Sequence, residues 1–171
     1  ENIMIHRNES GSLELLDCTI RDGGYLNEWN FSDEEVLDCY KAATDAGYTY
    51  FEIGFKRKKP ENPTIKSKWY YCLDEDVNEV VSKLKGCKIA VLVEFLKGDI
   101  DISDFVEKKK SNISLVRVLT KLSYPQEELK KFCKELINYG YEVALNIIAS
   151  DAIDDIEINK VTKDFHDVEL K

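Results

Sequence analysis

The chain has 171 residues, of which 43% are hydrophobic and 33% charged, and its formal net charge is −9. This composition is too apolar for a disordered chain, and the length suits one ordinary domain. The negative charge opposes binding to nucleic acid or to an anionic membrane, and no apolar run reaches the roughly 18 residues of a membrane-spanning helix. The start of the chain also lacks a signal-peptide pattern. We therefore expect a cytoplasmic domain that acts on a small molecule.

The chain has five cysteines, which are widely spaced and form no Cys-x-x-Cys pair. An odd number of cysteines without that spacing is typical of reduced thiols in a protein core rather than of a disulfide framework or a zinc site. The two histidines lie near opposite ends of the chain and do not have the spacing of metal ligands.

Six apolar segments, rich in β-branched and aromatic residues, are predicted strands. They cover residues 14–18, 49–53, 87–94, 113–119, 141–148 and, with a weaker pattern, 166–170. Several are apolar at nearly every position, which is typical of a parallel sheet covered on both faces.

Helical patterns separate these strands. The helix after the first strand has the clearest limits, because Ser32 and Glu35 form a capping-box pattern and Gly47 ends it. Further helices are predicted over residues 77–84 and 129–136 from their apolar spacing, and with weaker patterns over 103–109 and 154–163.

The alternation of strands and helices predicts a parallel α/β fold. The units can close into a TIM-type (βα) barrel or form an open doubly wound sheet, and periodicity does not choose between them. A complete barrel needs about 250 residues, so this chain would hold roughly five to six of the eight units. We expect residues 1–171 to form one partial barrel domain that stops before the seventh and eighth strands.

The first predicted strand runs directly into Arg21, Asp22, Gly23 and Gly24. We expect the two glycines to turn the chain sharply, so that both charged side chains reach one small volume. An arginine can hold an enolate or carboxylate oxygen, and an aspartate can ligate a divalent metal. Because function gathers at the carboxyl ends of parallel strands, this segment is the strongest candidate site. The alternative is a salt bridge within a turn.

Polar side chains also interrupt later strands. Glu52 lies in an otherwise apolar strand, and Arg117 and Asn146 lie within two others. Their similar positions suggest one polar cavity. Glu52 and Arg117 could instead form a structural ion pair, and Asn146 and Glu94 could only cap strand ends.

A run of four cations, Lys56 to Lys59, follows the second strand. It could attract an anionic substrate or a phosphate, but a solvated loop is the interpretation we prefer. The side chains of Tyr25 and Trp29 could line a pocket near the first candidate site or fill the mouth of the barrel.

The segment from Asp17 to Gly24, with Glu52 and Gly54 one unit later, resembles the DRE-type metal-dependent aldolase and lyase superfamily. That group includes 4-hydroxy-2-oxovalerate aldolase, 3-hydroxy-3-methylglutaryl-CoA lyase, isopropylmalate synthase and homocitrate synthase. The resemblance implies a TIM barrel in which Asp22 ligates Mg²⁺ or Mn²⁺ and Arg21 stabilises an enolate formed beside a 2-oxo acid. Glu52 would support the metal and substrate, with Tyr25, Arg117 and Asn146 as substrate-binding residues.

Two departures from that superfamily are visible. The histidine base that follows Arg-Asp-Gly in the oxovalerate aldolases has no counterpart here, because Tyr25 occupies its neighbourhood. The His-x-His pair with which the superfamily completes its metal site is also missing. The chain could be part of a longer enzyme, recruit strands from another subunit in a homo-oligomer, or have lost catalysis. We favour the first, because an open half-barrel leaves strand edges exposed.

Two competing functions follow from the same residues. A Schiff-base aldolase needs a lysine at a strand end, for which Lys97 and Lys121 are weak candidates. A non-catalytic α/β module that binds an acidic metabolite or a partner protein needs neither metal nor lysine.

Overall fold

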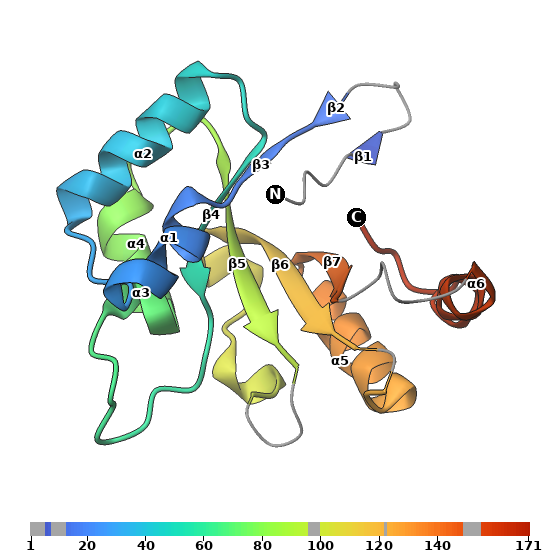
Figure 1. The fold of residues 1–171 in the computed structure, drawn as a ribbon. Helices are drawn as coiled ribbons and strands as arrows, with labels where there is room; N and C mark the ends of the chain where they lie inside the picture. Colours follow the sequence, from blue (N-terminus) through green and yellow to red (C-terminus); the bar gives the residue numbers. More distant parts are fainter. Residues whose placement is uncertain (1–5, 8–12, 96–99, 122, 149–154) are drawn as a thin grey trace.

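Five parallel strands form the centre of the molecule (Figure 1). The computed structural model describes residues 6–7, 13–95, 100–121, 123–148 and 155–171. The strands are β3 (Leu16–Asp17), β4 (Tyr50–Phe55), β5 (Lys88–Glu94), β6 (Ile113–Thr120) and β7 (Glu142–Ile147). A short antiparallel pair, β1 (His6–Arg7) and β2 (Leu13–Glu14), precedes them.

The order of the strands in the sheet is their order in the sequence, β3-β4-β5-β6-β7. A doubly wound sheet reverses its strand order at a switch point, whereas a barrel adds each strand beside the last. The sequential strand order therefore fits the barrel and not the doubly wound sheet. The chain is an α/β protein whose five parallel strands curl into a half-barrel, which confirms the predicted fold class.

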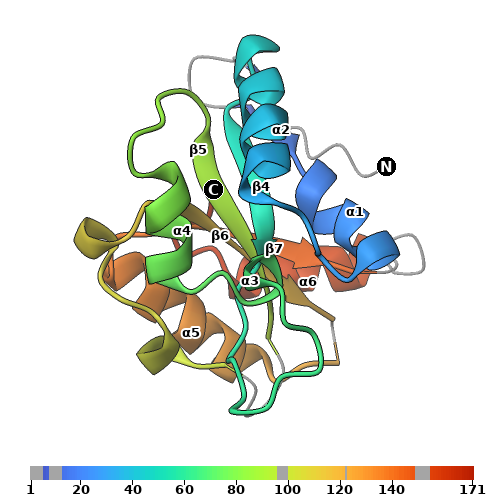
Figure 2. The ribbon, with the colours of Figure 1, turned by 90° about the vertical axis from the view of Figure 1, so that its left-hand side faces the viewer.

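Helices cover the outer face of this sheet (Figure 2). The helices of the described residues are α1 (Thr19–Asn27), α2 (Asp33–Asp45), α3 (Lys68–Tyr71), α4 (Asp74–Val81), α5 (Gln126–Asn138) and α6 (Asp155–Asp164), of which α2, α4 and α5 pack along this outer face. The capping box that starts α2 is present, since the Ser32 hydroxyl accepts from the amide of Glu35 and the Glu35 carboxylate accepts from the amide of Ser32. None of the described helices is long and apolar enough to cross a membrane.

Two predicted elements differ from the structure. The predicted helix at 103–109 is instead two 3-10 turns, η1 (Ile102–Asp104) and η2 (Lys108–Lys110). The Asp101 carboxylate caps η1, and the backbone becomes extended at Phe105, whose ring is buried against Phe132. A continuous helix would lose this packing.

The weak strand predicted at 166–170 does not form. The chain turns after α6 and reaches β7 only at Lys171, whose amide donates to the carbonyl of Val143 at 2.7 Å. A single bond is not a ladder, so the sheet in the described part of the chain has five strands.

The two faces of the sheet are packed differently. The outer face, under the helices, contributes to a large apolar core that includes Phe51, Ile53 and Val116. The concave face has only a small apolar layer, made of Tyr50, Ala90, Leu115 and Ala144 with Leu16 beside them. Nearer the carboxyl ends of the strands, this concave layer gives way to charged residues.

Candidate functional site

The segment after β3 forms a helix rather than the predicted glycine turn. Helix α1 begins at Thr19 and includes both Gly23 and Gly24. The Asp17 carboxylate accepts from the amide and the hydroxyl of Thr19, at 3.0 and 3.1 Å, and these bonds satisfy donor groups at the start of the helix. The turn prediction was therefore wrong, because local side-chain bonds favour a helix in spite of the two glycines.

Gly24 has a different role, which is to let Trp29 approach the helix. A Cβ atom at Gly24 would lie 2.1 Å from the indole ring, whereas a Cβ at Gly23 would meet its nearest neighbour, Phe31, only at 3.4 Å. The indole Nε1 donates to the carbonyl of Arg21 at 2.8 Å, and Trp29 is buried. Trp29 thus fixes the backbone at Arg21, a role that its sequence position alone did not reveal.

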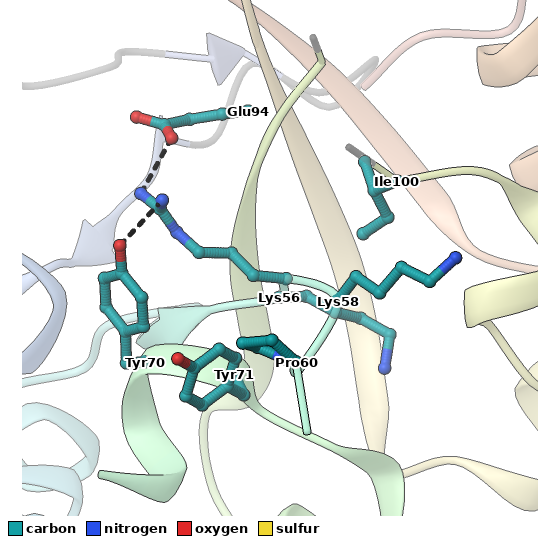
Figure 3. A pocket seen from close by; sticks show the side chains of 8 residues that line it. Lys56, Lys58, Pro60, Tyr70, Tyr71, Glu94 and Ile100 are labelled. Atoms are coloured by element: carbon teal, nitrogen blue, oxygen red, sulfur yellow. Dashed lines mark hydrogen bonds and ion pairs between the residues drawn. The ribbon is translucent and has the colours of Figure 1, made fainter. Parts of the chain in front are cut away.

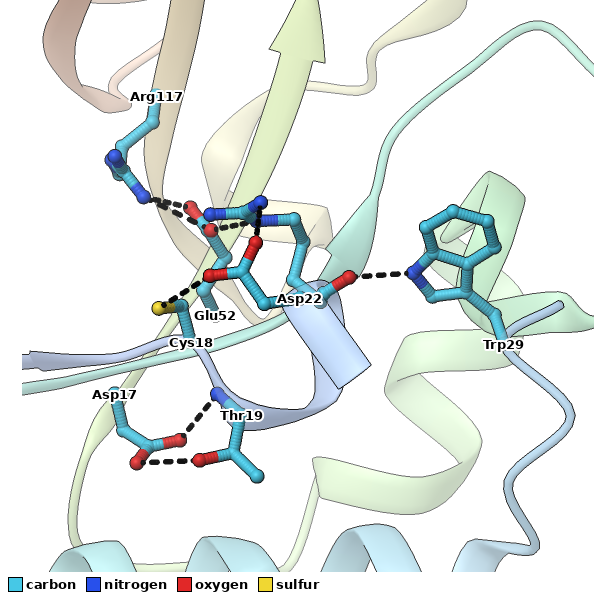
Figure 4. Close-up of polar contacts among 8 residues, drawn as sticks. Asp17, Cys18, Thr19, Asp22, Trp29, Glu52 and Arg117 are labelled. Atoms are coloured by element: carbon cyan, nitrogen blue, oxygen red, sulfur yellow. Dashed lines mark hydrogen bonds and ion pairs between the residues drawn. The ribbon is translucent and has the colours of Figure 1, made fainter. Parts of the chain in front are cut away.

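Arg21 and Arg117 converge on one carboxylate, Glu52, on the concave face (Figure 4). The Nε of Arg21 donates to Oε1 of Glu52 at 2.6 Å. Arg117 donates through one terminal nitrogen to both oxygens of Glu52, at 3.0 and 2.8 Å. Strand β5 separates the strands of Glu52 and Arg117, so the contact crosses the concave surface. The predicted ion pair between Glu52 and Arg117 is present, and Arg21 joins it.

This cluster is buried and electrostatically unusual. Glu52 is completely buried, and the side chains of Arg21 and Arg117 are 12% and 6% exposed. Burial acts to lower the pKa of Arg21, but the attraction of Glu52 and Asp22 outweighs it and raises the pKa above its ordinary value. The buried Nε of Arg117 has no hydrogen-bond partner among the described residues. The site therefore has donor capacity for a further anion.

Asp22 lies at the more exposed side of the cluster. Its carboxylate accepts from a terminal nitrogen of Arg21 and from the Cys18 thiol, whose sulfur is 3.1 Å away. Burial, together with the hydrogen bond to Asp22, raises the pKa of Cys18 to about 11. Cys18 is therefore a neutral donor at physiological pH and not a thiolate nucleophile.

The described residues do not complete a metal centre. Asp22 is exposed enough to offer oxygen lone pairs to a divalent cation, but both oxygens of Glu52 are engaged by guanidinium groups. No group of three or more histidine, cysteine, aspartate or glutamate side chains in the described part of the chain could hold a metal ion. Mg²⁺ is usually held by one or two carboxylates together with water and substrate oxygens, so Asp22 would be a single protein ligand of such a site.

Two other predicted site residues lie near this cluster without bonding to it. Tyr25 is 62% exposed and packs edge to face on Trp29 and Phe55. Burial of the hydroxyl and the charge of Glu94 raise its pKa, so Tyr25 stays protonated at neutral pH. Asn146 is half-buried on β7, on the same face as Arg117 but two residue pairs nearer the carboxyl end of the sheet.

The cation run after β4 is only partly a solvated loop. Lys56 is buried, and its ammonium donates to Asp74 at 2.8 Å. Arg57 forms an ion pair with Glu94 at 2.7 Å (Figure 3). The interpretation as a solvated loop fits Lys58 and Lys59, which are exposed, but it was wrong for the first two residues because each has a buried or aromatic partner.

The two weak candidates for a Schiff-base lysine gain no support. Lys97 lies outside the described residues, and Lys121 is exposed just after β6. Lys56, at the end of β4, was not considered from sequence. Its amino group is engaged by the Asp74 carboxylate and the carbonyl of Cys72, so the geometry does not present it to a substrate.

The sequence matches no protein-family model and no curated protein. Two solved structures of TsXylA, an intracellular xylanase from Thermoanaerobacterium saccharolyticum JW/SL-YS485, are similar to the chain with a TM-score of 0.50 and 10% identity. One aligns over 80% of this chain and 50% of the xylanase chain, and the other, a mutant with xylotriose, over 86% and 52%. The chain thus spans about half the length of these structures. The similarity supports a partial TIM-barrel fold and no particular reaction.

Proposed function

We propose that the chain forms the first five βα units of a TIM-barrel enzyme that forms or cleaves a carbon–carbon bond beside the keto group of a 2-oxo acid. The reaction would pass through an enolate, as in the aldolases and lyases that the Arg21-Asp22 segment resembles. The observation that supports this most strongly is the convergence of Arg21 and Arg117 on buried Glu52 at the carboxyl end of the sheet.

The roles of the three residues follow from their contacts. Glu52 holds both guanidinium groups in place and offsets their mutual repulsion, so it is a positioning residue. Arg117, with its unpartnered Nε, would bind the carboxylate of the 2-oxo acid, and Arg21 would donate to the oxygen that becomes the enolate. Donors that are fixed before the reaction stabilise developing charge without reorganising during it.

The proposed reaction is the aldol cleavage of a 4-hydroxy-2-oxo acid. A base removes the proton of the C4 hydroxyl, the bond between C3 and C4 breaks, and its electron pair moves to the keto oxygen as an enolate. An aldehyde leaves, and C3 is then protonated. The raised pKa of Tyr25 makes its phenol a donor to the substrate at neutral pH rather than the base.

A divalent cation is a separate part of the proposal. Mg²⁺ or Mn²⁺ at Asp22 would add Lewis-acid stabilisation of the enolate, with its remaining ligands drawn from groups outside the described residues. Calorimetric titration with Mn²⁺ tests this assignment. We expect Asp22→Asn to weaken binding at least tenfold, and equal affinity in the two proteins would remove Asp22 as a ligand.

Solvent exchange tests the enolate directly. An enolate returns to the ketone with a solvent proton, so the C3 hydrogens of 2-oxobutyrate should exchange in D₂O faster with the protein than without it. Proton NMR should show this catalysed rate falling at least 100-fold in Arg21→Gln, about 3 kcal/mol of lost stabilisation. Lys131→Gln, an exposed substitution on α5, should leave the rate unchanged. Equal rates in wild type and Arg21→Gln would overturn the proposal.

A non-catalytic module that binds an acidic metabolite is the second candidate. It is favoured by one observation, the lack of a complete metal-ligand group among the residues that the structure describes. Such a module would bind a 2-oxo acid at Arg21 and Arg117 while catalysing no exchange at C3 with or without Mn²⁺.

A further inference from the structure

A polar hollow lies near the candidate site, where the chain leaves β4. It has a volume of about 330 Å³ and is lined by Lys56, Arg57, Lys58, Tyr70, Tyr71 and Glu94, among others (Figure 3). A second hollow of about 450 Å³ shares three of these cations and adds Lys59 and Asp104. Four consecutive basic residues thus surround one space in a chain whose net charge is −9.

Aromatic rings hold Arg57 rigidly at the wall of this space. Its guanidinium carbon lies 4.2 Å from the ring centre of Phe55 and 4.4 Å from that of Tyr70. One terminal nitrogen donates to the Tyr70 hydroxyl at 2.9 Å, and the other pairs with Glu94. The Nε of Arg57 is buried and has no partner among the described residues. The stacking and these two contacts fix the guanidinium group of Arg57 in one orientation at the wall of the hollow.

Only some of the charged side chains around the hollow have ion-pair partners. Lys56 is neutralised by Asp74 and Arg57 by Glu94, whereas Lys58 and Lys59 form no ion pair within the described part of the chain. Asp104, the remaining carboxylate on the rim, accepts from the amide of Asp101. Lys58, Lys59 and Asp104 together leave one unmatched positive charge, which favours an anionic group such as a phosphate monoester, and the Tyr71 hydroxyl adds a donor.

The hollow is adjacent to the arginine cluster. The ring of Phe55 contacts both sites, because the guanidinium carbon of Arg21 lies 5.9 Å from its centre on the side of the cluster. A ligand could therefore place one anionic end at Arg21 and Arg117 and another at Lys58 and Lys59.

We propose that this hollow is a phosphate-binding subsite, which receives the phosphate group of a phosphorylated substrate. The phosphate subsite depends only on the residues around Arg57. The further step, that the other end of the substrate is a 2-oxo acid, rests on the function proposed above.

Calorimetric titration with inorganic phosphate at constant ionic strength tests the subsite. The informative variant is Lys58→Gln with Lys59→Gln, because both side chains are exposed and their loss should not disturb folding. Lys109→Gln with Lys131→Gln is the matched control, since it removes the same charge from side chains that are 72% and 76% exposed elsewhere.

We expect phosphate binding to weaken at least fivefold in the Lys58 and Lys59 variant and to stay within twofold of wild type in the control. Arg21→Gln should also retain phosphate binding, so the subsite is separable from the carbon chemistry. The proposal fails if both double variants bind phosphate equally, if Arg21→Gln alone abolishes binding, or if succinate, a dicarboxylate, binds the hollow as tightly as phosphate.

Discussion

The two faces of the sheet differ in the kind of side chain that they bury. The outer face is apolar and covered by helices, whose inward side chains, such as Leu136 of α5, are completely buried. The concave face buries a carboxylate between two guanidinium groups above a thin apolar layer. Because burying charges costs more than an apolar replacement of the same shape, stability alone does not explain the concave face. The outer face therefore maintains the fold, while the buried charges of the concave face are the basis of the anion binding that we propose there.

The largest expected effect comes from removing the buried carboxylate. Glu52→Gln leaves the buried Arg117 without a countercharge and Arg21 with only the more exposed Asp22, which should cost about 3–5 kcal/mol of unfolding free energy. Urea unfolding measures this. Glu142→Gln is the matched change near the other end of the same face, where the partner Lys88 is 46% exposed, and it should cost about 1 kcal/mol or less. Similar losses in the two variants would contradict the claim that burial makes Glu52 special.

A cavity on the outer face should separate stability from binding. Leu136→Ala removes a completely buried side chain and should cost about 3 kcal/mol, again measured by urea unfolding. The folded fraction should nevertheless bind anions at the concave face as tightly as wild type does. If Leu136→Ala weakened anion binding as much as a substitution at Arg21, the two faces would not be functionally distinct.

Alanine substitutions at two adjacent glycines should change stability by smaller amounts and in opposite directions. Gly24→Ala forces a methyl group into the ring of Trp29 and should destabilise the protein by about 1–3 kcal/mol. Gly23→Ala has room for the methyl group and should stabilise α1 by about 0.5–1 kcal/mol. Thermal unfolding of both variants provides the comparison. A stabilising Gly24→Ala would show that Trp29 does not pack against the helix as described.

The smallest expected effect is on the pH dependence at Cys18. Its folded pKa is raised to about 11, so the thiol contributes stability that is present below about pH 9 and lost as the pH rises through 11. Alkylation of Cys18 by iodoacetamide, followed by peptide mass spectrometry, should therefore accelerate only above about pH 9. Asp22→Asn removes the carboxylate that accepts from the thiol and should shift this profile to lower pH. An unchanged profile would contradict the bond between them.

Much of the fold follows from local sequence patterns. Apolar segments located all five parallel strands to within a few residues, and the Ser32 capping box located the start of α2. The barrel could not be separated from an open sheet, because strand order depends on which strands pair in space. The predicted strand at 166–170 was wrong because Val168 and Leu170 pack on the apolar core while only the Lys171 amide bonds to β7.

The candidate site was only partly predictable. The positions of Glu52 and Arg117 within apolar strands signalled a buried ion pair, since isolated charges there are costly. The role of Trp29 was not foreseen, although two glycines five or six residues before a tryptophan are a usable signal of close helix packing. The partners of Lys56 and Arg57, which lie on α3, α4 and β5 or beside them, depend on tertiary contacts that a single sequence does not display.

Oxalate binding tests the central claim most directly, because oxalate has the planar dianionic form of a 2-oxo acid enolate. Calorimetry should show that wild type binds oxalate and that Arg21→Lys, which keeps the charge but loses the guanidinium fork, binds it at least tenfold more weakly. Lys131→Gln should bind as wild type does. Equal oxalate affinity in wild type and Arg21→Lys, or no binding by wild type, would contradict the assignment of the concave arginine cluster as an enolate-binding site.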